Sequence, residues 1–122
     1  MSEPPTVYIT NRSASHDYTS ATKHGAIRFV TSGNYPVFKT SRLQEEVAEA
    51  LAYSQPSDYL LLSGSSVVAS ICVAVWLEMH STCHILIWDR VQDVYVLRII
   101  SKSEIAQLVA EVANRLQFTR SS

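Results

Sequence analysis

The sequence DYLLLSGSSVVASICVAVWLEMH, residues 58–80, contains two apolar runs separated by four small residues, SGSS. The first run, 59–63, has no polar alternation, which is typical of a strand that is buried on both faces. The second run, 66–79, is long enough to form a helix. Another apolar run follows at 83–88, and a strand–helix–strand order of this kind predicts a right-handed parallel crossover. These residues therefore predict an α/β protein.

Further strands are expected on both sides of this unit. The runs at 7–10 and 26–31 have strand character, and a short edge strand is predicted at 36–39. The polar turn at 89–93 is expected to return the chain, so that 94–100 pairs with the preceding strand as a hairpin.

Two further helices are predicted from capping signals and apolar stripes. Ser41 with Gln44, and Ser101 with Glu104, have the spacing of a capping box. The stripe of the first of these helices includes Leu43, Val47 and Leu51. The stripe of the last helix is formed by Ile105, Leu108, Val109, Val112 and Leu116.

The length of 122 residues fits a single α/β domain over 1–122, with loose termini at 1–6 and 119–122. We expect a three-layer α/β sandwich. Its central sheet would be mostly parallel, with about five strands including a C-terminal hairpin strand, and three helices would accompany it.

The composition favours a folded chain with a covered surface. Hydrophobic residues make up 47% and charged residues 17%, which is a low charge content for a small monomer. One interpretation is a homo-oligomer, most simply a dimer, in which a second copy covers apolar surface. The other interpretation is a monomer with a well-filled core. The predicted helix at 66–79 is apolar nearly all round, which fits either one.

The absence of charge from 59 to 77 raises the question of a membrane span. The four small residues interrupt this window where a strand-to-helix turn would place them, and the apolar remainder is about half as long as a span. We therefore expect no membrane segment. Cys72 and Cys83 lie in apolar runs without metal-ligand spacing, so we interpret them as reduced core residues of a cytoplasmic protein.

The charge distribution bears on possible ligands. The net charge is −1, but residues 1–44 hold five Lys or Arg against two acids, and residues 45–122 hold five against nine. The N-terminal part is the better place for an anion. There is no basic face and no aromatic–basic interleaving for nucleic acid. No histidine pair has zinc-site spacing, so neither a metal nor a cofactor is expected.

The SGSS turn is the first candidate site. In open α/β sheets, ligands bind beyond the carboxyl ends of the strands, where helix N-termini also point. Gly64 would allow close approach, and Ser65 and Ser66 with the free N–H groups of the helix could hold a phosphate or carboxylate. The turn lacks the Lys-Ser/Thr of a nucleotide P-loop. The alternative is that Ser65 or Ser66 only caps the helix.

The second candidate site is the loop NRSASHD, residues 11–17, after the first strand. If that strand runs parallel to 59–63, the loop opens at the same edge of the sheet. Arg12 suits a phosphate, and His16 could exchange a proton, with Asp17 as a further catalytic candidate. The alternative is an ordinary polar surface loop. Asp89 follows the fourth strand and could bind a ribose hydroxyl or a cation, or could simply form a turn.

These patterns lead to one preferred function and two alternatives. The preferred function is binding of a phosphorylated or otherwise anionic small ligand, with a nucleotide as the first choice. No complete catalytic set can be named, so binding is favoured over turnover. The first alternative is a homo-oligomeric interaction or inhibitor module of viral or mobile-element origin. The second is a small nucleotide hydrolase or nuclease that uses His16. The expected ligand-binding residues are Asn11, Arg12, Ser13, His16, Gly64, Ser65, Ser66 and Asp89.

Overall fold

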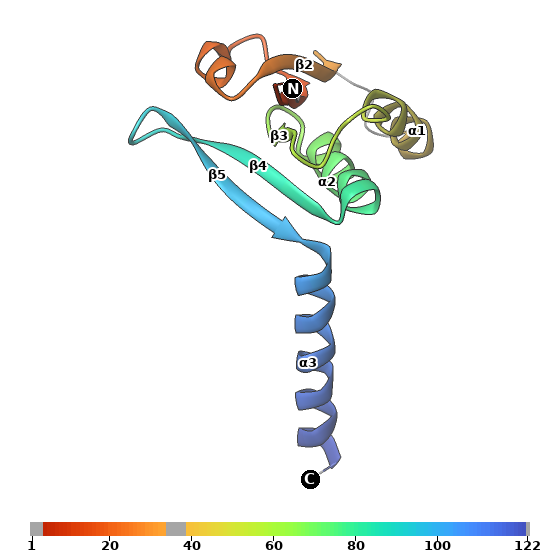
Figure 1. Ribbon diagram of the computed structural model, residues 1–122. Helices are drawn as coiled ribbons and strands as arrows, with labels where there is room; N and C mark the ends of the chain where they lie inside the picture. Colours follow the sequence, from red (N-terminus) through yellow and green to blue (C-terminus); the bar gives the residue numbers. More distant parts are fainter. Residues whose placement is uncertain (1–3, 34–38, 122) are drawn as a thin grey trace.

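A computed structural model describes residues 4–33 and 39–121, with side chains up to residue 117 (Figure 1). The elements in chain order are β1 (Thr6–Arg12), the 3-10 helix η1 (Thr19–Lys23), β2 (Ala26–Ser32), α1 (Thr40–Ala50), β3 (Tyr59–Leu61), α2 (Ser66–His80), β4 (Thr82–Asp89), β5 (Val94–Ser101) and α3 (Lys102–Ser121).

The strands form one five-stranded sheet in the order β2-β1-β3-β4-β5. The first four strands of this order are mutually parallel, and β5 pairs antiparallel with β4 as a hairpin. The predicted α/β fold, with a mostly parallel sheet, three helices and a C-terminal hairpin strand, is confirmed. β1 and β3 are parallel neighbours, with Val7 opposite Tyr59 and Ile9 opposite Leu61. The two candidate loops therefore open at the same edge.

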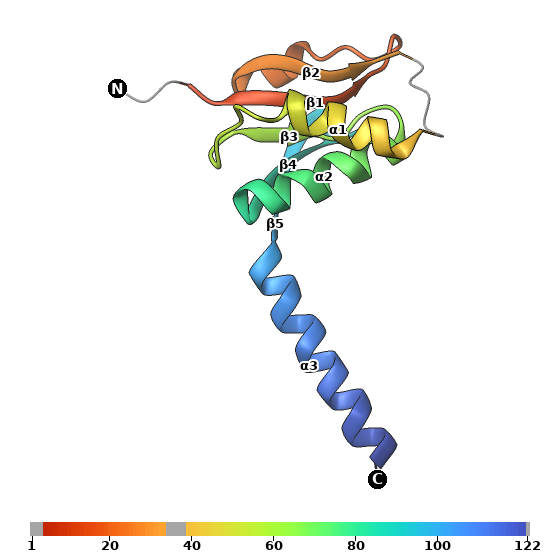
Figure 2. The same ribbon diagram turned by 90° about the vertical axis from the view of Figure 1, so that its right-hand side faces the viewer.

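The two faces of the sheet are covered differently. α1 and α2 lie side by side on one face (Figure 2). Their buried side chains, including Leu43, Val47 and Trp76, pack against Tyr8 and Leu60 of the sheet. On the other face, the segment between β1 and β2 supplies the cover. The core on that side contains Val7, Ile9, Tyr18, Ala21, Leu61, Leu86 and Tyr95. The third layer is thus a loop with a short 3-10 helix.

Two capping predictions have different outcomes. The Ser41 prediction is wrong, because α1 begins at Thr40 after Lys39 and has no side-chain cap. Ser41 therefore lies inside the first turn of the helix. The Ser101 prediction is confirmed in its first half, because the Ser101 Oγ accepts the Glu104 N–H at 3.3 Å. The predicted edge strand at 36–39 lies outside the described residues, except for Lys39.

α3 leaves the body of the protein and runs away from it in both views (Figures 1 and 2). All its side chains from Lys102 to Gln117 are exposed. Its apolar stripe therefore has no cover among the described residues, and α3 adds no layer to the sandwich.

The cysteines lie inside the body, whereas α2 buries only Val68, Cys72 and Trp76 and leaves part of its apolar surface exposed. Cys72 and Cys83 are free and buried, as expected, and burial raises the pKa of each thiol to about 12. Across residues 4–33 and 39–121, no helix combines the length and the apolar character needed to cross a membrane.

Candidate functional site

Asn11 joins the ends of three strands at the carboxyl edge of the sheet. Its side chain is buried, and its amide nitrogen donates to the Thr31 Oγ1 at 2.9 Å and to the Gly33 carbonyl at 3.1 Å. Its carbonyl oxygen accepts the Ser65 N–H at 3.1 Å. Each polar atom of the Asn11 amide therefore has a partner within the protein.

A second set of hydrogen bonds closes the gap between β1 and the start of the α2 turn. The Thr10 Oγ1 donates to the Ser63 carbonyl and accepts the Ser63 N–H, both at 2.9 Å. The Tyr18 hydroxyl lies 2.6 Å from the Ser63 Oγ and accepts the Ser13 N–H at 2.8 Å. The polar residues of this edge are thus largely committed to one another.

Gly64 is required by the closeness of this packing. Its φ of +72° is in the left-handed region, which favours glycine. A Cβ at this position would lie 2.1 Å from the Asn11 Oδ1. The space beside Gly64, which was predicted to receive a ligand, is therefore occupied by the Asn11 side chain.

A hollow of about 530 Å³ lies in front of this network. It is lined by residues from the two predicted loops and from the end of β2, namely Asn11, Arg12, Ser13, Ala14, Gly33, Gly64 and Ser65. The structure therefore brings most of the predicted ligand-binding residues together. Ligand binding by these residues stays a prediction.

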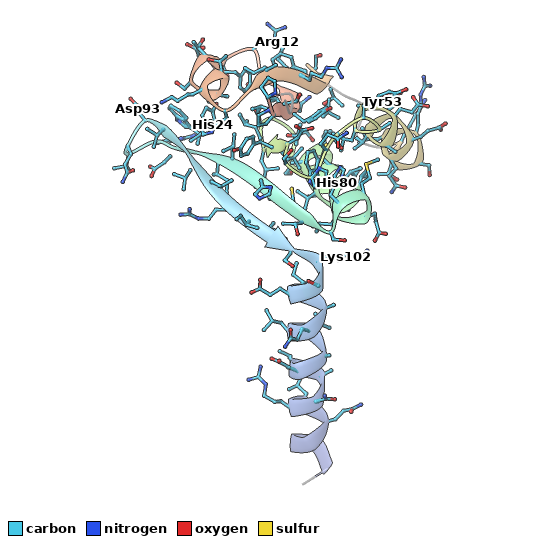
Figure 3. All side chains as sticks on the ribbon, viewed as in Figure 1. Arg12, His24, Tyr53, His80, Asp93 and Lys102 are labelled. Carbon is cyan, nitrogen blue, oxygen red and sulfur yellow. The ribbon has the colours of Figure 1, made fainter. Side chains whose placement is uncertain are left out.

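Arg12 and the two serines of the turn have distinct positions. The Arg12 guanidinium lies 5.1 Å from the centre of the Phe29 ring, at the outer side of the sheet (Figure 3). The Ser65 Oγ accepts the Val68 N–H at 3.4 Å, so the capping interpretation of Ser65 is confirmed. Ser66 lines a separate shallow hollow on the side of α2.

His16 does not line the hollow, and its ring belongs to an aromatic cluster. Its Nε2 lies 2.7 Å from the Tyr95 hydroxyl, and its ring packs against Tyr18 and Trp88. Burial raises the pKa of Tyr95 to about 12, helped by the neighbouring Tyr18 and Asp17.

Asp17 and Asp89 both form turns. The Asp17 carboxylate accepts the hydroxyl and the N–H of Thr19, at 2.6 and 2.9 Å, and these bonds lower its pKa. His16 and Asp17 therefore have different hydrogen-bond partners. The Asp89 carboxylate accepts the N–H groups of Val91 and Gln92, which confirms its turn-forming interpretation. Among the described residues, no three His, Cys, Asp or Glu side chains are grouped so as to hold a metal ion.

A second hollow, of about 850 Å³, lies at the opposite edge and was missed by the sequence analysis. It is lined in part by Tyr8, Arg28, Tyr53 and Asp58. Both carboxylate oxygens of Asp58 accept backbone N–H groups, from Thr6 and Gln55 at 2.8 Å. Asp58 thus holds the loop before β3 against β1. In the sequence, the only feature that could have indicated this role is the position of Asp58 as an isolated acid at the start of an apolar run.

The exposed stripe of α3 is the other candidate site. We call its five side chains the α3 stripe; their exposed fractions are 45% for Ile105, 50% for Leu108, 62% for Val109, 42% for Val112 and 59% for Leu116. Contiguous exposed apolar surface of this kind marks protein–protein interaction sites.

The direction in which α3 leaves the body is fixed at its first residue. No residue separates β5 from α3. The Lys102 N–H donates to the Ser81 carbonyl at 2.8 Å, and the Lys102 ammonium lies 2.7 Å from the Glu78 carboxylate (Figure 3). These contacts tie the start of α3 to the end of α2.

Comparison with known proteins identifies a family. The family model described as Phage Pam3 gp32-like protein matches residues 5–102. The matched segment contains the whole sheet with α1 and α2, and it ends at the first residue of α3. No curated protein and no solved structure matches the chain.

Proposed function

The chain belongs to the phage Pam3 gp32-like family, and we propose that it is a phage-encoded assembly protein that binds another protein through the α3 stripe. It would act in the cytoplasm of the infected cell. The sheet with α1 and α2 would serve as a folded base that holds α3 in a fixed direction.

The observation that carries this proposal is the uncovered helix itself. Most of the stability of a helix in a protein comes from packing of its apolar face against another element. α3 has 20 residues and such a face, but residues 4–33 and 39–117 supply nothing that covers it. A protein partner would provide the missing cover.

Two charges placed in the α3 stripe should prevent the proposed binding of another protein. We expect the double variant Val109→Glu/Val112→Glu to lower the yield of infectious particles at least about tenfold, because carboxylates resist burial in an apolar contact. The measurement is plaque titre after complementation of a phage that lacks its own copy of the gene.

The matched control is Ala110→Glu/Asn114→Glu, which adds the same charge to the same helix outside the stripe. It should leave the titre near that of the unmodified chain. Equal titres for the two double variants would refute the proposal, provided that both proteins melt at similar temperatures.

A second candidate function is anion binding at the carboxyl edge. The specific observation that favours it is the parallel pairing of β1 and β3, which brings Arg12 and Ser65 to one hollow. Because the Asn11 amide is already satisfied, an anion would meet the Arg12 guanidinium and the Ser13 hydroxyl. The proposed ligand is a phosphorylated small molecule such as a nucleotide. The hydrolase alternative gains no support, because the His16 Nε2 is bonded to Tyr95.

Removal of the Arg12 guanidinium tests this second candidate. We expect Arg12→Ala to weaken binding of inorganic phosphate or a nucleotide about tenfold or more, because a charge-assisted hydrogen bond is lost. Isothermal titration calorimetry measures the affinity. Arg28→Ala, at the opposite edge, should bind like the unmodified protein. If the unmodified protein binds none of these anions, this candidate is excluded.

A further inference from the structure

We propose that the partner of the α3 stripe is a second copy of this chain, and that the two α3 helices pair side by side in antiparallel orientation. This inference rests on the proposed function, since it identifies the protein that covers the stripe. It adds the identity of the partner and the geometry of the contact.

No element in the described part of this chain covers the stripe. α3 follows β5 without a connecting residue, and the hydrogen bond from Lys102 to Ser81 and the ion pair with Glu78 hold its first turn. A helix needs a connecting loop to turn back on the element before it. The cover must therefore come from another molecule.

The spacing of the stripe favours another helix as the partner. Ile105, Val109, Val112 and Leu116 follow one another at intervals of four, three and four residues. This is the repeat of a coiled-coil seam, in which apolar side chains of one helix fill the gaps of a second. Leu108 flanks the seam, and no charged residue interrupts it. α3 itself presents such a seam, so a second copy is a matching surface.

The shape of the molecule excludes a parallel pair. Packed helices have their axes about 8–10 Å apart. The body extends beyond the start of α3 on both sides in each of two perpendicular views (Figures 1 and 2). Two bodies at the same end of a parallel pair would therefore collide. An antiparallel pair places them at opposite ends of helices about 30 Å long.

Antiparallel alignment also matches side chains across the pair. When the two stripes are centred on each other, Ile105 lies opposite Leu116 of the second copy, and Val109 lies opposite Val112. The opposed helix dipoles attract, whereas a parallel pair would place like dipole ends together.

The surface area buried between the two helices is expected to be small, so we expect a reversible dimer. A specific interface usually needs roughly 1,000 Å² in total, and five half-exposed side chains from each copy place this pair at the low end. We therefore expect the apparent mass of the full-length chain to double with rising concentration in sedimentation velocity. Val109→Glu/Val112→Glu should stay monomeric, and Ala110→Glu/Asn114→Glu should still dimerise.

Disulfide trapping tests the orientation. Val109→Cys and Val112→Cys variants are mixed and oxidised. An antiparallel pair should give mostly the mixed 109–112 disulfide, whereas a parallel pair would give mostly 109–109 and 112–112 disulfides. The native thiols are buried, and their pKa values of about 12 keep them protonated at neutral pH.

The outcomes separate this inference from the proposed function. A chain that stays monomeric at all concentrations overturns the self-pairing. The proposed function still stands in that case if the Val109→Glu/Val112→Glu variant loses phage yield. Dimers that trap mostly 109–109 and 112–112 disulfides, or no disulfide at all, overturn the antiparallel geometry. A concentration-dependent dimer with the mixed disulfide supports the inference in full.

Discussion

Replacement of Trp76 by alanine is expected to lower the free energy of unfolding by about 3–5 kcal/mol, as large-to-small changes of buried aromatic residues do. Trp76 is fully buried, and its ring packs edge-to-face with the Tyr8 ring, with 5.8 Å between the ring centres. Its indole N–H donates to the Thr82 carbonyl at 3.1 Å. The substitution would leave a cavity between α2 and the sheet and remove the partner of the Thr82 carbonyl.

Unfolding in urea, followed by circular dichroism, measures the Trp76→Ala effect. Met79→Ala is the control on the same helix, because the Met79 side chain is 40% exposed. We expect it to cost less than about 1 kcal/mol. Similar losses for the two variants would show that α2 does not bury Trp76 against the sheet.

Replacement of Gly64 by alanine should be nearly as harmful, at about 2–5 kcal/mol. The positive φ costs an L-residue about 1–2 kcal/mol. The new Cβ would in addition meet the Asn11 Oδ1, so the Asn11 side chain would have to move. Its bonds to Ser65, Thr31 and Gly33 would then weaken, at about 1–3 kcal/mol for the buried groups left without partners.

Gly33→Ala separates the two causes. Gly33 also has a positive φ, of +67°, but a Cβ there would meet nothing within 4 Å. Its cost in urea unfolding should stay near about 1–2 kcal/mol. In an Asn11→Ala background, Gly64→Ala should cost no more than Gly33→Ala, because the clash has gone. Equal costs for the two glycines in the unmodified chain would contradict the close contact with Asn11.

The residues at the carboxyl edge of the sheet show which parts of the candidate site local sequence patterns can predict. The sequence predicted that Asn11, Arg12, Gly64 and Ser65 would share an edge if the first and third strands were parallel neighbours, and β1 and β3 are such neighbours. The sequence could not show that Asn11 itself fills the space beside Gly64. That contact joins residues more than 50 positions apart, and the hydrogen bond from Ser65 spans 54 positions.

The prediction for His16 also depended on a long-range contact that the sequence does not show. A histidine in a polar loop suggested proton exchange near the ligand. The structure turns the ring toward Tyr95, 79 positions away, where the hairpin of β4 and β5 brings an aromatic cluster under the loop. The sequence contains no local sign of that approach, because it depends on how the hairpin extends along the sheet.

The helices and strands could be predicted from local patterns, because apolar runs, alternation and turn residues act over a few neighbouring positions. The sequence also determined that α3 has a face to be covered. That the described residues leave this face open depends on the tertiary structure, because the direct junction of β5 and α3 and the contacts of Lys102 with Ser81 and Glu78 direct the helix away from the sheet. An amphipathic pattern indicates that a helix has a face to be covered. Which element can cover that face depends on the geometry of the folded chain.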